Sequence, residues 1–224
     1  MRYIRLFEQI RPSEFEIIMM TPYEAFKRVK DEIENEKPDL ELIKDIFDYS
    51  VIDVNYKDEN NPTLLHLAIL VGEPDIVKLL IEHPNINPNV YDGVWGTPLN
   101  STTHIHYRRA ERICPILLEH PLTDPNAQNN YGKTPLIIFA NQNLKYLVEL
   151  FLNNPKIDPN CQDGEGDTPL MKVVPYDHRD DIVRLLLNHP KIDVKIKNDK
   201  GETAWDMASN KIRQQFPQLN PNFR

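Results

Sequence analysis

The chain of 224 residues contains an internal repeat, and this repeat limits its possible folds more than any other feature. Thr-Pro-Leu, or a weaker copy of it, begins in steps of 34, 37, 34 and 35 residues at Thr63, Thr97, Thr134, Thr168 and Thr203. A second motif of the type Ile-Asp-Pro-Asn keeps the same steps and ends at Asn55, Asn89, Asn126, Asn160 and Lys195. Two motifs that stay in phase over five copies indicate a solenoid made from one repeated supersecondary element.

Each repeat has the pattern of two short helices followed by an extended loop. Thr caps the first helix, and Pro suits its first position because the N–H that Pro lacks is not needed there. In the repeat that begins at Thr63, Gly72 starts the break between the helices, and the second helix is apolar on most sides, which predicts burial. The second helix ends before Pro84 because a residue preceding proline disfavours helical geometry. We predict an all-α solenoid of helix-turn-helix repeats with short β-hairpin loops.

This pattern resembles the ankyrin repeat over about residues 50–210. The resemblance is carried by the Asp/Asn-x-Asn segment, the Thr-Pro-Leu start and the Val/Ile-Val-x-Leu-Leu second helix, together with His66, Ala68 and the turn glycines Gly132, Gly166 and Gly201. It implies L-shaped stacked helix pairs with projecting hairpins, concave on the side of the hairpins and first helices. It also implies that a protein partner binds that side. The loops are similar to those of ankyrin-repeat effectors of intracellular bacteria.

The ends of the chain depart from the repeat. Residues 21–53 hold 10 acidic and 5 basic residues, and such a polar outer face keeps a terminal repeat soluble. We expect an N-terminal extension with the apolar spacing of a short helix over 1–20, a divergent capping helix pair over 21–55, ankyrin-like repeats over 56–202, a C-terminal capping unit over 203–217 and a tail over 218–224.

Charge and composition argue against some classes of binding partner. Lys and Arg number 26 against 34 Asp and Glu, a net charge of −8, whereas nucleic-acid binders usually carry a basic excess. No apolar run is long enough to cross a bilayer, and the first residues lack the apolar core of a secretory signal. The two cysteines, Cys114 and Cys161, fit a reducing compartment. We expect a monomer that binds neither nucleic acid nor membrane and is cytoplasmic or delivered to a host cytosol.

The repeat that begins at Thr97, the second of the full repeats, is irregular. It is three residues longer than the first, and the excess falls within 104–112. Pro115 lies inside its second helix, where it removes a backbone hydrogen bond. Two outcomes are open: the helix starts near Ile113, or it is kinked.

Trp95 stands in this repeat where the others have a turn residue such as glycine. A bulky residue is disfavoured at positive φ, so we expect Gly93 or Gly96 to take over the turn. The fourth repeat has one extra residue near 175–179.

No constellation in the sequence has catalytic or metal-binding spacing, so we expect a non-enzymatic protein without cofactor. Three histidines lie a repeat apart and cannot converge on one ion: His83, His120 and His189. The loop from Asp163 to Asp167 lacks the ligand spacing of a calcium loop, and we interpret it as a solvated turn. We interpret both cysteines as structural.

The ankyrin resemblance places the binding surface on the hairpin tips and the exposed side of the first helices. On this chain the candidate residues are Glu59, Asn60, Val94, Trp95, His104, Tyr107, Asn130, Tyr131, Lys133, Glu165, Asp167 and Tyr176. Trp and Tyr are enriched in hot spots, which favours Trp95 beside Tyr131 as the anchor pair. The alternative is that Trp95 folds back onto its own repeat. The cluster Arg108, Arg109 and Arg112 either grips an acidic partner or is a solvated face.

We therefore predict a module that docks a protein partner on its concave face. The alternative is an adaptor or secreted effector whose N-terminal segment, within residues 1–50, recruits a second, catalytic protein.

Overall fold

The computed structural model describes residues 16–222 apart from 18, 51 and 58–61. The chain divides into two compact units, an N-terminal unit that ends at Asn87 and a C-terminal unit that begins at Pro88. All regular secondary structure in the described residues is helical, and none of their helices is both long and apolar enough to cross a membrane.

The N-terminal unit contains two helix pairs. Their bounds are α3 (Pro22–Ile33), α4 (Leu40–Tyr49), α5 (Leu64–Val71) and α6 (Pro74–Ile81). Thr21 starts α3 with a capping box, in which the Thr21 hydroxyl accepts from the Glu24 N–H at 3.3 Å and the Glu24 carboxylate accepts from the Thr21 N–H at 2.8 Å. The apolar residues Ala25, Phe26, Val29 and Ile33 form the buried face of α3, and α5 packs against both α3 and α6.

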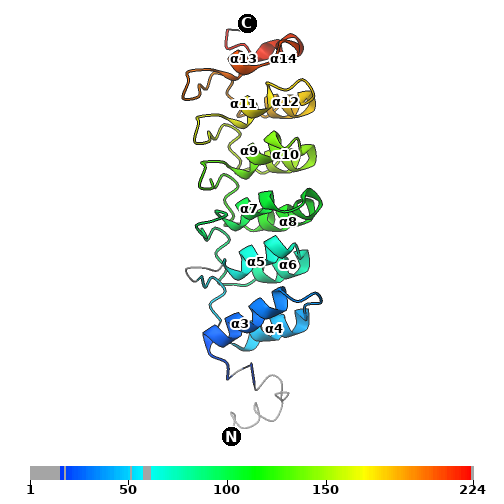
Figure 1. The fold of residues 1–224 in the computed structure, drawn as a ribbon, viewed down its shortest axis with the longest axis vertical. Coiled ribbons are helices and arrows are strands. Elements are labelled where there is room, and N and C mark those ends of the chain that lie inside the picture. Colours follow the sequence, from blue (N-terminus) through cyan, green and yellow to red (C-terminus); the bar gives the residue numbers. More distant parts are fainter. Residues whose placement is uncertain (1–15, 18, 51, 58–61, 223–224) are drawn as a thin grey trace. The chain divides into compact units, whose positions relative to one another are not determined.

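The C-terminal unit stacks four helix pairs in chain order, and the loops that join consecutive pairs project from one side (Figure 1). The first helices contact one another in succession and the second helices lie alongside them. Their bounds are α7 (Pro98–Ser101), continued by the 3-10 helix η1 (Thr102–His104), α8 (Tyr107–Glu119), α9 (Pro135–Asn141), α10 (Lys145–Leu152), α11 (Pro169–Val173), α12 (Asp180–Leu187), α13 (Ala204–Met207), α14 (Asn210–Gln215) and the 3-10 helix η2 (Pro217–Leu219).

Threonine caps start the first helices as the motif predicts. Each threonine hydroxyl accepts a hydrogen bond from the backbone N–H three residues later, at Thr63, Thr97, Thr134, Thr168 and Thr203. His66 is fully buried, and its Nδ1 lies 2.7 Å from the Thr63 hydroxyl. The Thr-Pro-Leu motif therefore encodes a helix start in every copy.

The loops of the C-terminal unit are tight hairpin-like turns, and their described residues form no regular strand. The five-residue loop from Asn129 to Lys133 closes with two backbone hydrogen bonds, from the Asn129 N–H to the Lys133 carbonyl at 3.0 Å and from the Gly132 N–H to the Asn129 carbonyl at 2.9 Å. The side chain of the first residue then accepts from two N–H groups of the same loop, Tyr131 at 3.0 Å and Lys133 at 3.1 Å for Asn129. Loops of this length leave no residues for a longer ladder.

The insertion in the second repeat is absorbed at the start of its second helix. Helix α8 begins at Tyr107 and runs 13 residues through Pro115, so a start near Ile113 is wrong. The physical reason is that His106 caps α8 early, by accepting from the Arg108 N–H at 3.4 Å. The first helix is correspondingly short, with four residues in α7.

Glycines adopt the left-handed geometry around Trp95 as predicted. Gly93 has φ of 88° and Gly96 has φ of 93°, whereas the other loops use the glycine at the position equivalent to Trp95, such as Gly132 with φ of 69°. Both candidate glycines therefore take over the turn.

The segment after the last helix pair packs onto the C-terminal unit. Pro217 starts the 3-10 helix η2, and the Leu219 side chain is fully buried.

Asparagine side chains join consecutive repeats. Asn126 donates from Nδ2 to the Lys156 carbonyl at 2.8 Å, and its Oδ1 accepts from the Asp158 N–H at 2.8 Å. Equivalent pairs of bonds leave Asn55 in the N-terminal unit and Asn89 and Asn160 in the C-terminal unit. We call this set the asparagine ladder. It ends where the motif changes to Lys195.

Asn126→Ala is expected to lower the free energy of unfolding by about 1–2 kcal/mol, because two hydrogen bonds between repeats are lost together. Urea unfolding followed by circular dichroism measures this loss. Lys195→Ala is the matched control, since it changes the equivalent position at the end of the ladder. A loss at Lys195 as large as at Asn126 would contradict the role given to the ladder.

Candidate protein-binding surface

The loop ends of the C-terminal unit form a connected series, which we call the tip row: residues 92–96, 129–133, 163–167 and 198–202. Asn130 donates to the Gly93 carbonyl at 2.9 Å and also accepts from the Tyr91 hydroxyl. Further along, the Gly164 N–H donates to the Tyr131 carbonyl at 3.1 Å, and the Asp199 N–H donates to the Glu165 carbonyl at 3.2 Å. Each tip is therefore tied to the next.

A second set of hydrogen bonds, made by glutamine side chains next to the tips, also joins successive loops. Gln128 donates to the Gln162 carbonyl at 2.8 Å, and Gln162 donates to the Lys197 carbonyl at 2.9 Å. The loops also approach closely, because a Cβ atom at Gly132 would lie 2.7 Å from the Gly164 nitrogen. Gly132 is therefore required both for its positive φ and for this contact.

Two apolar side chains of the tip row are highly exposed. Tyr131 is 74% exposed and Val94 is 67% exposed, the largest values for apolar residues of the tip row. Large exposed apolar groups on a rigid support are typical anchors of protein interfaces. The tip row thus presents one aromatic and one aliphatic side chain, on neighbouring loops, as candidate anchors for a partner.

Trp95 folds back onto its own repeat, as the second of the two sequence hypotheses states. Its ring is half-buried and lies 4.7 Å, between centroids, from the ring of His104, which follows the first helix. Among the ring contacts of the described residues, Trp95 pairs with His104 and not with Tyr131. Partial burial lowers the pKa of His104 against the opposing pull of the Asp92 carboxylate, so the histidine beneath the tryptophan is mainly neutral at pH 7.

The acidic loop of the fourth repeat is a closed ion cluster, so the predicted solvated turn is wrong. Lys172 from α11 places its Nζ 2.9 Å from Asp163, 3.0 Å from Glu165 and 2.6 Å from Asp167. The Lys172 side chain is only 15% exposed, and that of Asp163 is fully buried. The ammonium group thus occupies the place where three carboxylates of this arrangement could hold a metal ion.

Asp167 is therefore not an exposed tip residue, contrary to the sequence prediction. Its second oxygen accepts from Asn198 Nδ2 at 2.8 Å, which leaves both carboxylate oxygens engaged. The signal for this cluster was present in the sequence. Lys172 is charged at a position that holds Leu67, Ser101, Ile138 or Met207 in the other repeats.

The electrostatics of the cluster follow from burial and hydrogen bonding. Burial alone would raise the pKa of Asp163, but bonds from Lys172 and from the Glu165 and Asp167 N–H groups outweigh it, and the pKa lies below the ordinary value. Burial likewise opposes charge on Lys172, yet its bonds to the three carboxylates raise its pKa above the usual range. The Asp163 carboxylate and the Lys172 ammonium group are therefore both charged at neutral pH.

The other candidate residues lie at separate places. Asn130 and Glu165 are exposed on tips and Lys133 is half-buried. Tyr107 begins α8, and Tyr176 lies exposed after α11 with the Arg179 guanidinium 3.9 Å above its ring. Glu59 and Asn60 fall outside the described residues.

Both cysteines have suppressed reactivity. Burial raises the pKa of Cys114 to about 12, and burial with help from nearby carboxylates raises the pKa of Cys161 to about 11. Because the thiolate is the nucleophile, neither side chain is activated at pH 7.

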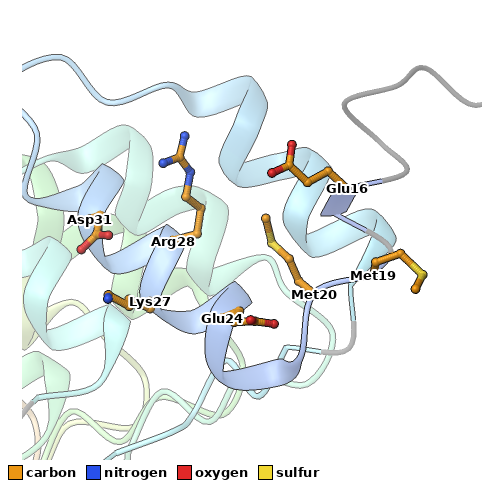
Figure 2. A pocket seen from close by; sticks show the side chains of 7 residues that line it. All are labelled: Glu16, Met19, Met20, Glu24, Lys27, Arg28 and Asp31. Carbon is orange, nitrogen blue, oxygen red and sulfur yellow. The ribbon is translucent and has the colours of Figure 1, made fainter.

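A separate hollow of about 590 Å³ lies on the N-terminal unit; we call it the N-terminal hollow. Its lining residues are Glu16, Met19, Met20, Glu24, Lys27, Arg28 and Asp31. Figure 2 shows Met20 extending over the hollow beside α3 while Met19 points away from that helix. Met19 is 70% exposed, which gives this unit an apolar group with little cover.

Lys172→Met is expected to lower the free energy of unfolding by about 2 kcal/mol at pH 7, because carboxylates would lose their buried counter-ion. The folded pKa of Asp163 lies below its unfolded value, so the stabilisation is present above about pH 4 and is lost as pH falls through the folded pKa. The difference between variant and wild type should therefore shrink on acidification. Urea unfolding at a series of pH values measures both effects.

Lys145→Met is the matched control for this experiment. Lys145 lies 2.8 Å from Asp181, but both side chains of this pair are more than half exposed, so its loss should matter far less. Equal losses in the two variants at pH 7 would show that the cluster around Lys172 has no special stabilising effect.

Comparisons with known proteins agree with this geometry. A family model described as "Ankyrin repeats (3 copies)" matches residues 103–198 and 140–214, and one described as "Ankyrin repeat" matches residues 60–90. Among curated proteins, the mitochondrial liver isoform of glutaminase from Rattus norvegicus is 36% identical over 61 residues, which are 27% of this chain. The chain spans only about a tenth of the length of that relative.

Solved structures share the fold at low identity. The ankyrin repeat protein EF0377 has a TM-score of 0.72 at 24% identity, covering 92% of this chain and 100% of its own. An ankyrin repeat domain from Acinetobacter baumannii AYE has a TM-score of 0.69 at 21% identity, covering 89% and 96%. A chain of the complex of the predatory endopeptidase Bd0816 with the immunity protein Bd3460, from Bdellovibrio bacteriovorus, has a TM-score of 0.62 at 24% identity, covering 89% and 98%.

The family models cover half of the chain or more, and they match the segments where the threonine caps and the asparagine ladder recur. The resemblance identified from the sequence is thereby confirmed, and this chain belongs to the ankyrin repeat family.

Proposed function

We propose that the tip row and the adjoining Trp95–His104 stack form a non-enzymatic docking surface for a protein partner. Ankyrin repeats are in general protein-interaction modules without catalytic activity. The single observation that carries the proposal for this chain is the exposure of Tyr131 and Val94 on loops that are hydrogen-bonded to their neighbours.

The rigidity of the tips supports this function energetically. Binding is opposed by the entropy lost when loops and side chains become ordered. In the tip row the turns are already closed by their own Asx side chains, and adjacent turns are tied together. A partner would therefore order few groups on this side of the interface, and more of the gain from burying Tyr131 would remain as affinity.

Tyr131→Ala and Trp95→Ala are each expected to weaken partner binding by about 2 kcal/mol or more, as hot-spot residues do. They should differ in stability. Tyr131 is exposed, so its replacement should leave unfolding unchanged, whereas Trp95 packs on His104 and should lose about 1 kcal/mol of stability. The measurement is interferometry with a partner isolated by affinity capture on the full chain, together with thermal unfolding of each variant.

Tyr146→Ala is the matched control, because Tyr146 is 52% exposed but belongs to the second helix α10, away from the loops. It should leave affinity unchanged. If Tyr131→Ala has no effect, or if Tyr146→Ala weakens binding equally, the docking surface does not lie on the tip row.

A second candidate is an adaptor function of the N-terminal unit, favoured by the N-terminal hollow. Met side chains are flexible and polarisable, which suits surfaces that adapt to different partners. Here Met19 and Met20 lie among the charged residues of α3 and its approach. The chain would then hold one partner on the tip row and a second partner at the hollow.

Met20→Glu tests the adaptor function, because it places a charge in the apolar part of the hollow. It should abolish capture of one protein while capture of the tip-row partner continues. Lys44→Glu, which alters an exposed residue of α4 outside the hollow, is the control. An identical set of captured proteins for Met20→Glu and wild type would rule out recruitment through the hollow.

A further inference from the structure

We propose that the start of α8 recognises an acidic segment of the partner, so that the docking surface continues from the tip row onto a basic edge. This inference rests on the proposed function and specifies the chemistry of the partner. We call the group of Tyr107, Arg108, Arg109 and Arg112 the arginine edge. All four side chains are exposed.

The insertion of the second repeat creates this edge. The extra residues add helical turns to the start of α8 and expose arginines there, while Ala110, Ile113 and Cys114 keep the helix buried on its inner side. Arg108 and Arg112 are four residues apart and therefore lie on the same face of the helix. An extension that only filled a gap in the stack would not need three exposed guanidinium groups.

Ring pairs occur both beside the tip row and in the arginine edge, and His104 and His106 are two residues apart in the chain. Trp95 lies on the ring of His104 at 4.7 Å, and the next ring pair along the chain is His106 and Tyr107 at 4.5 Å. The Arg108 guanidinium lies 5.9 Å from the centre of the Tyr107 ring, and its Nε donates to the Tyr107 hydroxyl at 3.3 Å. A partner that covers Trp95 and His104 would therefore bind close along the chain to Tyr107 and the arginines that follow it.

The stacked arrangement of Arg108 favours a carboxylate ligand. A guanidinium has donors on both of its edges, and a bond from Nε to a tyrosine leaves the terminal nitrogens for a second acceptor. Arginine pairs with carboxylates through two parallel N–H···O bonds, which is the strongest form of charge-assisted hydrogen bond. The ring face of Tyr107 limits the directions that Arg108 can adopt, so less entropy is lost on binding.

The charge distribution indicates why an acidic segment would bind here and not elsewhere on the chain. The net charge is −8, so most of the surface repels an acidic partner. Residues 104–112 hold three arginines against a single glutamate, Glu111. In the same unit, the acidic tip of the fourth repeat is partly neutralised by Lys172, which reduces the repulsion along the tip row.

An acidic protein segment fits the edge better than a nucleic acid or a lipid surface. Binding to a phosphate backbone is driven by many contacts that release counter-ions, and six to ten such contacts are common. The arginine edge offers three cations on a chain of opposite overall charge. A short run of Asp or Glu beside an apolar residue needs only two or three contacts and also covers the rings.

The test uses a phage-displayed library of random dodecapeptides panned on the full-length chain. Selected peptides should carry Asp or Glu next to an aromatic or aliphatic residue, and higher salt should weaken their binding. In fluorescence anisotropy with one selected peptide, the double variant Arg108→Gln/Arg112→Gln should raise the dissociation constant at least about tenfold, the change produced by about 1.4 kcal/mol. Both arginines are exposed, so circular dichroism of the variant should match that of the wild type.

The matched control removes two positive charges from another exposed site of the same unit, with Lys195→Gln/Lys197→Gln. It should change the dissociation constant less than about twofold. These two lysines lie outside the arginine edge and act on the peptide only through the screened long-range electrostatic potential. Equal effects of the two double variants would overturn the proposal, since they would show that the peptide responds to the overall charge of the chain and not to a specific binding site. Failure to select any peptide, or selection of neutral or basic peptides, would overturn it as well.

Two further arms separate the remaining outcomes. If poly(U) RNA, or vesicles of phosphatidylcholine and phosphatidylserine, bound with the same dependence on Arg108 and Arg112 and displaced the peptide, the edge would be a phosphate site and the proposal would be wrong. If the selected peptides depended on Tyr131 but not on the arginines, this inference would fail while the proposed docking surface stood. If binding depended on neither, both would fail.

Discussion

The asparagine ladder is the interaction on which the rest of the fold depends. The helices of the C-terminal unit are short, several of them four to eight residues long, and such helices are not stable alone in water. Apolar burial draws neighbouring repeats together, but it is non-directional and does not fix their register. An asparagine that both donates to and accepts from the next repeat fixes register, because one amide must meet a carbonyl and an N–H two residues apart.

The ladder also explains how the second repeat tolerates its insertion. Asn89 donates to the Leu122 carbonyl at 2.6 Å and accepts from the Asp124 N–H at 2.9 Å, the same pair of bonds that Asn126 makes across a shorter repeat. The added residues therefore alter the repeat at the start of α8 and not at its contact with the next repeat. In the second repeat the added length and the added arginines thus lie at the exposed start of α8, while the two bonds from Asn89 to the next repeat are kept.

The sequence predicted the features that are local or periodic and missed those that depend on packing between elements. Threonine caps, turn glycines and the repeat itself need only neighbouring residues or a constant step, so they were readable from the sequence. The Lys172 cluster was missed because it joins a loop to a helix side chain that has no counterpart in the other repeats. For Trp95 the sequence left two hypotheses open, because the choice between them depends on packing against His104, which ends the 3-10 helix that continues the short first helix. For α8 the sequence left open a start near Ile113 or a kink, and the early cap at His106, a weaker signal than Pro115, excludes the start near Ile113.

The Lys172 cluster has a consequence for the surface as well as for stability. Three converging carboxylates left alone would repel one another and open the loop, and a metal ion would make its shape depend on the supply of that ion. Lys172, from the same repeat, removes both the repulsion between the carboxylates and the need for a metal ion. Its raised pKa and the lowered pKa of Asp163 keep the pair charged over the whole neutral range. The tip from 163 to 167 therefore keeps one shape, and through the bond from Gly164 to the Tyr131 carbonyl it holds the neighbouring tip in place. An ion pair between a loop and the helix that follows it thus helps to fix the exposed tyrosine of the neighbouring loop, which links the stability of the fourth repeat to the geometry of the surface proposed for binding.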